Sequence, residues 1–152
     1  MTRLSYRDAT RDDLAFIVGL MVKDSVVATD DLPDQPHHPS YLAAFDAIAT
    51  DANQRLVVAE LDGAPVGTIQ LTFIPGLYRL GMWRGLIEAV HIIPSQRSKG
   101  LGGEMIQLAL DQCRERGCGM AQLTSNKKRL DAHRFYERLG FQKSHEGFKF
   151  YF

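Results

Sequence analysis

A glycine-rich stretch between an apolar segment and an amphipathic segment carries the clearest chemical signal in the sequence. The stretch reads PSQRSKGLGGE and begins at Pro94. Its glycines are Gly100, Gly102 and Gly103. Glycines at the start of a helix leave backbone N–H groups uncovered, and the helix dipole favours negative charge there. The stretch therefore predicts a phosphate or diphosphate site, with Arg97 and Lys99 adding positive charge at its mouth.

Two common nucleotide motifs do not fit this stretch. The P-loop requires Gly-Lys-Ser/Thr after its glycines, whereas Gly102 is followed by Gly103 and Glu104. The dinucleotide fingerprint requires a third glycine where this chain has Met105. A tight strand-to-helix turn without a ligand is the alternative interpretation. The Glu104 carboxylate would repel a phosphate here unless it points away.

Glu88 is a candidate for acid–base chemistry. It interrupts the apolar run over 86–93, which predicts a buried strand. A carboxylate in such a place is either a catalytic base or an edge-facing or salt-bridged side chain. Period-two alternation along the strand places Glu88 on the face opposite Ala89 and His91.

The elements that must position these residues alternate between strands and helices. Alternation and apolar runs predict strands over 3–7, 55–61, 65–73, 83–93 and 120–124, and a final strand or pair over 141–152. Helical spacing predicts a helix beginning after Thr10 and further helices over 40–50, 100–116 and 131–139. The expected order is β-α-α-β-β-β-α-β-α-β, an α/β (α+β) fold, in one domain over 1–152.

Composition excludes several classes of protein. The 152 residues suffice for one hydrophobic core, and 18 Lys+Arg balance 18 Asp+Glu, so there is no cationic excess to grip nucleic acid. No apolar run approaches the ~20 residues of a membrane span, and the N-terminus lacks the apolar core of a secretion signal. Cys113 and Cys118 are too few and too close for a disulfide framework or a zinc site. We expect a cytoplasmic protein without nucleic-acid, membrane or metal partners.

A proline-rich loop over 30–39 carries acids and two histidines. One hypothesis is that its acids attract a cationic amine; a solvated loop is the alternative. The acids are Asp30, Asp31 and Asp34. His37 and His38 resemble half of a metal site, but no carboxylate or cysteine spacing completes it.

Two motifs in the chain resemble those of the GCN5-related N-acetyltransferases. Arg97-x-x-Gly100-x-Gly102, placed after an apolar strand, resembles that family's diphosphate-binding signature. The segment AHRFYERLGF at 132–141 resembles its C-terminal motif A-x-x-[LF]-Y-E-x-x-G-F. The order and spacing of the motifs fit, so the resemblance covers nearly the whole chain. The segment over 124–136 is similar to the branch that contains aminoalkylphosphonate N-acetyltransferases and other small-amine acetylators.

The resemblance implies a mixed, mostly antiparallel sheet flanked by helices. It also implies direct transfer of an acetyl group from acetyl-CoA to a primary amine of a small molecule. The arm of the cofactor is expected to pair with the strand at Val90, His91 and Ile92, and its diphosphate to lie on the glycine turn. The cofactor-binding residues expected in that turn are Arg97, Ser98, Lys99, Gly100, Leu101, Gly102 and Gly103.

The resemblance further assigns roles in the reaction. Glu88 is expected to take the amine proton directly or through water, Tyr136 to protonate the leaving thiolate, and a backbone N–H near Val90 to meet the oxyanion. Packing in an apolar helix face is the alternative for Tyr136. The family asparagine seven residues before this tyrosine is Arg129 here, and Asn126 is expected to take its place near the pantetheine arm.

Three further hypotheses accompany this assignment. A homodimer is an expectation from the family. The other functions weighed are a protein or peptide N-acetyltransferase and a non-catalytic acyl-CoA-binding sensor.

Overall fold

The computed structural model describes residues 3–152, which form two compact units. The first unit ends at Gln122, and the second runs over Leu123–Phe152. The single domain expected over 1–152 stays a prediction.

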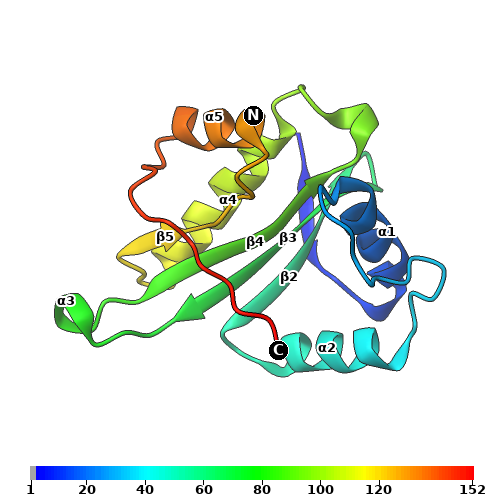
Figure 1. Cartoon of the computed structure of the whole chain (residues 1–152), viewed down its shortest axis with the longest axis horizontal. Helices are drawn as coiled ribbons and strands as arrows, with labels where there is room; N and C mark the ends of the chain where they lie inside the picture. Colours follow the sequence, from blue (N-terminus) through cyan, green and yellow to red (C-terminus); the bar gives the residue numbers. More distant parts are fainter. Residues whose placement is uncertain (1–2) are drawn as a thin grey trace. The chain divides into compact units, whose positions relative to one another are not determined.

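A five-stranded sheet forms the centre of the first unit (Figure 1). Its strands are β1 (Ser5–Asp8), β2 (Gln54–Leu61), β3 (Ala64–Ile74), β4 (Arg84–Ile92) and β5 (Met120–Gln122). They lie in the order β1-β2-β3-β4-β5, antiparallel throughout except for the parallel pair β4 and β5. Asp62 and Gly63 turn the chain between β2 and β3 with φ of 53° and 78°, as the Asp-Gly pair predicts.

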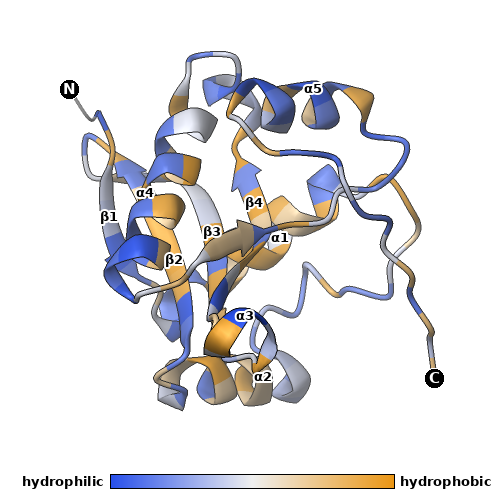
Figure 2. Ribbon diagram, turned by 90° about the vertical axis from the view of Figure 1, so that its left-hand side faces the viewer, coloured by the Kyte–Doolittle hydropathy of each residue, from blue (hydrophilic) through white to orange (hydrophobic). Residues whose placement is uncertain are grey.

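Helices cover both faces of this sheet. The helix α1 (Leu14–Asp24) lies on one face and α4 (Leu101–Glu115) on the other, as Figure 2 shows. The helix α2 (Pro39–Thr50) packs beside β2. The single turns η1 (Arg11–Asp13) and η2 (Pro94–Gln96) precede α1 and α4, respectively. The short helix α3 (Tyr78–Gly81), which the sequence does not predict, lies at the far end of the arm formed by β3 and β4 (Figure 1).

The core lies between the sheet and these helices. Its fully buried large side chains are Val57, Val58, Ile69, Leu71, Ile87, Leu101, Met105 and Ile106. Glycines in the sheet allow α4 to approach closely. A Cβ at Gly67 would lie 2.9 Å from Met105 Sδ, and one at Gly85 would lie 2.1 Å from Cys113 Sγ. Gly67 and Gly85 therefore mark the face of the sheet that α4 covers.

The second unit contains α5 (Leu130–Arg138) and a C-terminal segment without helix or strand. The prediction of a final strand or pair over 141–152 is wrong. Its alternating aromatic pattern favours a strand only where a neighbouring strand supplies backbone partners. The segment forms no ladder, and its aromatic side chains from Phe148 onward are exposed.

The predicted α/β architecture, with a mostly antiparallel sheet flanked by helices, is confirmed. Strand and helix boundaries from β1 to α5 lie close to those that the sequence predicts. No helix within residues 3–152 is both long and apolar enough to cross a membrane.

Candidate functional site

A β-bulge interrupts β4 next to Glu88. Gln70 of β3 pairs with Glu88, and Thr68 pairs with His91, so Ile69 faces two residues of β4 instead of one. Ala89, the first of these two, has a φ of 48°, a left-handed conformation that costs a non-glycine residue free energy. A bulge leaves one residue outside the regular ladder, so β4 carries backbone polar groups that β3 does not pair.

The bulge changes which side chains share a face of the sheet. Thr68 and Gln70 lie two residues apart and therefore on one face, and their partners His91 and Glu88 lie on that face with them. Strict alternation places Glu88 and His91 on opposite faces, and that prediction is wrong because the extra residue shifts the register. The shared face is the one covered by α1, since His91 Nδ1 lies 2.7 Å from Oδ2 of Asp24 in α1.

Glu88 itself is exposed on this face. Within residues 3–152 its carboxylate forms no ion pair with Arg, Lys or His, so the hypothesis of a salt-bridged Glu88 finds no support in the part of the chain that the structure describes. A solvent-accessible carboxylate is chemically able to accept a proton from a group that binds beside it.

The other edge of β4 is free over its second half. β5 pairs with β4 only from Arg84 to Leu86 and ends at Gln122. From Ile87 to Ile92, no strand within residues 3–152 borders β4 on that side. An extended ligand with amide groups could pair with this edge as an added strand does. The expected contacts at Val90, His91 and Ile92 fall on this stretch.

The strand leads into the glycine turn through η2. Ser98 and Gly100 have φ of 59° and 84°, and Gly100 is the N-cap of α4. The first intrahelical bond runs from Glu104 N–H to the Gly100 carbonyl at 3.2 Å. The N–H groups of Leu101, Gly102 and Gly103 consequently have no acceptor within the helix. Together with the dipole of a 15-residue helix, they form a cradle suited to a diphosphate.

The charged side chains of the turn are held in specific contacts. Arg97 donates from Nε to the Ile92 carbonyl at 3.0 Å and pairs with Asp24 through its terminal nitrogen, while Lys99 donates to Oε1 of Gln96 at 3.0 Å. Part of the positive charge expected at the mouth is therefore balanced by Asp24. The Glu104 carboxylate is turned toward Arg3 and accepts hydrogen bonds from Arg3 N and Nε, both at 3.0 Å. Its negative charge is therefore paired and does not stand against a phosphate at the turn.

Asp24 and Arg3 are residues that sequence reasoning missed. Asp24 joins α1 to His91 and Arg97, which lie 67 and 73 positions away, and Arg3 meets Glu104 across 101 positions. Local patterns carry no signal for such contacts.

Tyr136 and Asn126 belong to the second unit. The Tyr136 ring packs edge-to-face against Phe135 and Phe141, with centroids 5.1 and 5.8 Å apart. Burial raises the pKa of the Tyr136 phenol, and the nearby charge of Arg129 offsets part of that effect. The phenol thus keeps its proton at neutral pH. Asn126 Oδ1 accepts the Lys128 N–H at 2.9 Å and so shapes the turn that precedes α5.

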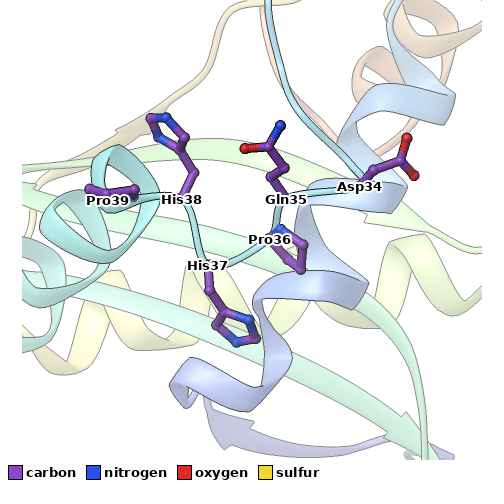
Figure 3. Close-up of a pocket in the computed structure, with 6 residues that line it drawn as sticks. All are labelled: Asp34, Gln35, Pro36, His37, His38 and Pro39. Atoms are coloured by element: carbon purple, nitrogen blue, oxygen red, sulfur yellow. The ribbon is translucent and has the colours of Figure 1, made fainter.

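The proline-rich loop forms a shallow hollow of about 390 Å³ lined by residues 34–39 (Figure 3). His37 and His38 point to opposite sides of the loop, and His38 Nδ1 accepts the Ser40 N–H at 3.2 Å at the start of α2. Asp31 accepts a hydrogen bond from the Tyr41 hydroxyl at 2.9 Å. The Asp34 carboxylate points away from His37 and His38 (Figure 3). Across residues 3–152, no group of three or more His, Cys, Asp or Glu side chains is arranged to hold a metal ion.

The two cysteines lie at the end of α4. Burial is the main cause that raises the pKa of the Cys113 thiol, to about 11, and burial also raises the pKa of Cys118. Protonated, partly buried thiols are poor nucleophiles. This electrostatic setting argues against an acyl-cysteine intermediate.

Comparison with known proteins matches residues 11–141 to the family model described as the acetyltransferase (GNAT) family. An aminoalkylphosphonate N-acetyltransferase of Salmonella typhimurium is 31% identical over 114 residues, which cover 75% of this chain and 73% of that protein. A glucosamine 6-phosphate N-acetyltransferase of Trypanosoma brucei brucei is 39% identical over 84 residues, 55% of this chain and 54% of that protein.

Among solved structures, one described as a transcriptional regulator from Bacillus halodurans C-125 is 40% identical. It superposes with a TM-score of 0.92 and covers 98% of this chain and 99% of its own.

Proposed function

Because the chain belongs to the acetyltransferase (GNAT) family and is an acetyl-transferring enzyme, we propose that it transfers an acetyl group from acetyl-CoA to the primary amine of a small molecule. One observation carries this proposal. The free edge of β4, beside a bulge, runs directly into a turn whose uncovered N–H groups suit a diphosphate. An extended amide-containing arm joined to a diphosphate is the chemistry of coenzyme A.

The binding residues follow from this arrangement. The pantetheine arm pairs with the backbone of Val90, His91 and Ile92, and the diphosphate accepts hydrogen bonds from the turn formed by residues 97–103. Within that turn, Arg97 and Lys99 supply positive charge, and the role of Asn126 toward the arm is proposed from the family resemblance alone. The N–H groups and the free strand edge described above support this part of the proposal.

The proposed reaction needs a base that deprotonates the amine and an acid that protonates the leaving thiolate. A primary alkylamine has a pKa of about 10.4, so at pH 7 only about one molecule in a few thousand is neutral. Glu88 takes a proton from the amine, directly or through water, and the nitrogen attacks the thioester carbonyl carbon. An N–H near Val90 stabilises the oxyanion. The C–S bond then breaks, Tyr136 donates its proton to the departing thiolate, and the nitrogen loses its second proton to solvent as the amide forms, while solvent returns a proton to the tyrosinate.

We infer the chemical class of the amine that accepts the acetyl group from the names of two relatives. These two are named for amines of small molecules, an aminoalkylphosphonate and glucosamine 6-phosphate. We place the amine on the face of the sheet that carries Glu88. A protein or peptide N-acetyltransferase is the alternative within enzymes.

A non-catalytic acyl-CoA sensor is the second candidate, because the solved relative of 40% identity is described as a transcriptional regulator. The formal charge of zero gives such a protein no general grip on nucleic acid.

Matched substitutions separate an enzyme from a sensor. For Glu88→Gln and Tyr136→Phe we expect a loss of kcat of about 10²-fold or more with unchanged affinity for coenzyme A. Glu115→Gln and Tyr151→Phe, which alter exposed residues of the same types, should retain full turnover. Turnover is measured as thiol release from acetyl-CoA with polyamines, aminophosphonates, amino acids, aminoglycosides and peptides. Binding of coenzyme A without turnover of any amine would favour the sensor, and no binding would refute both.

The proposal includes a homodimer in the cytoplasm. Leu77, Tyr78 and Leu80 are nearly or fully exposed at the tip of the β3–β4 arm, and such apolar patches are typical of protein contacts. Free thiols at Cys113 and Cys118 are compatible with a reducing compartment. Sedimentation equilibrium of the protein and of Leu80→Lys tests the dimer.

A further inference from the structure

We propose that Arg3 is a positioning residue for the diphosphate turn, an inference that rests on the proposed function. Arg3 lies just before β1 and reaches the start of α4 with both its backbone and its side chain. It holds two groups that would otherwise disfavour an anion at the turn: the carbonyl of Lys99 and the carboxylate of Glu104.

The first contact fixes the orientation of one peptide group. A terminal nitrogen of the Arg3 guanidinium donates to the Lys99 carbonyl. The Lys99 carbonyl and the Gly100 N–H belong to the same planar trans peptide and point in opposite directions. Holding the carbonyl toward Arg3 therefore directs the Gly100 N–H away from Arg3. Reversal of this peptide would replace a donor with a carbonyl dipole that repels phosphate.

The backbone of the turn makes such a restraint useful. Gly100 has a φ of 84°, and Ser98, a non-glycine residue, has a φ of 59°. Glycine has broad conformational freedom, so its neighbouring peptide can rotate unless a contact holds it. A Cβ at Gly100 would lie 3.2 Å from the guanidinium of Arg3, which shows how closely the side chain covers this residue.

The second contact removes a negative charge from the turn. Glu104 lies in the first turn of α4. Its Oε1 accepts from Arg3 Nε and its Oε2 from Arg3 N, both at 3.0 Å. Desolvation raises the pKa of Glu104, but hydrogen bonds from Arg3 outweigh it and lower this pKa overall. The carboxylate is therefore ionised, and both of its oxygens are hydrogen-bonded to Arg3. Without Arg3, a free carboxylate would lie beside the diphosphate.

Arginine suits this double role better than lysine. Its planar guanidinium carries several donors in a fixed fork and can serve the carbonyl and the carboxylate at the same time. A lysine ammonium at the same position reaches one of the two groups well. We therefore expect only partial function in Arg3→Lys.

The experiment compares two acetyl donors. Acetyl-CoA carries the diphosphate, whereas S-acetylpantetheine lacks it. For Arg3→Ala we expect the KM for acetyl-CoA and the Kd for coenzyme A to rise about tenfold, with Arg3→Lys in between. The kcat, and the kcat/KM with S-acetylpantetheine, should stay within about twofold of the wild type. Arg11→Ala removes another exposed arginine–carboxylate pair, with Asp46, and should leave all these constants unchanged.

A double variant tests the electrostatic step. Removing the charge of Glu104 in Arg3→Ala/Glu104→Gln should recover about threefold of the lost affinity, because only the peptide restraint is then missing. A double variant no tighter than Arg3→Ala would refute the role of Arg3 in screening Glu104.

Other outcomes overturn the whole inference. Wild-type affinity for coenzyme A in Arg3→Ala would do so, and so would an equal loss with both donors, since that would indicate a general loss of structure. These results are distinct from failure of the proposed function, in which the wild-type protein would bind no coenzyme A.

Discussion

The substitution Gly67→Ala tests whether the packing of α4 against the sheet controls the cofactor strand. A Cβ at Gly67 would lie 2.7 Å from the His91 carbonyl oxygen, 2.7 Å from Ile92 Cδ1 and 2.9 Å from Met105 Sδ. Ordinary contact begins at roughly 3.4 Å, so β4 must move by about 0.7 Å or α4 must retreat. Overpacking of this kind costs about 1–3 kcal/mol.

The expected result has two parts. The melting temperature should fall by about 5 °C for a domain of this size, and affinity for coenzyme A should fall by about tenfold because the displaced carbonyl lies on the strand proposed to pair with the pantetheine arm. Thermal unfolding and a coenzyme A titration measure both.

Gly19→Ala is the matched control. Gly19 lies inside α1, and a Cβ added there would meet no atom within 4 Å, so alanine should stabilise the helix by about 0.5–1 kcal/mol without affecting the cofactor. If Gly67→Ala melts and binds coenzyme A as the wild type does, the close approach of β3, β4 and α4 does not constrain the site and the reasoning is wrong.

Three further predictions concern titratable groups. Since burial raises the pKa of Tyr136, the alkaline loss of activity should fall at a higher pH than the ordinary tyrosine pKa of about 10, and a pH–rate profile of Tyr136→Phe should lack this limb; its persistence would assign the limb to another group. The thiols of Cys113 and Cys118 are protonated at about pH 7.5 and should react slowly with iodoacetamide. Treatment of the protein with this reagent should therefore leave activity intact, and rapid inactivation would contradict this prediction. Asp13, whose pKa the bonds from Arg7 lower, contributes stability that is present above about pH 4 and lost as the pH falls through its lowered value. Asp13→Asn should therefore lose about 2 kcal/mol in urea unfolding at pH 7 and show a shallower acid limb; an unchanged acid limb would refute this.

Local sequence patterns were sufficient to predict most of the strands and helices and the glycine turn. Alternation marks β2 and β3, the Asp62–Gly63 pair marks the turn between them, and helical spacing marks α4. These features depend on residues close in sequence, whose steric preferences act wherever the chain is placed. The same is true of the uncovered N–H groups after Gly100, which follow from the start of any helix.

Features that depend on partners far apart in the sequence could not be predicted from local patterns. The face shared by Glu88 and His91 follows from a bulge opposite Ile69, and a single inserted residue reverses every subsequent side chain. The aromatic segment at the C-terminus has a strand pattern but forms no ladder, because a strand needs a neighbouring edge that its own residues cannot supply. The contacts of Arg3 with Glu104 and Lys99 join segments about a hundred residues apart. Folding brings such partners together, and no short-range periodicity encodes their meeting.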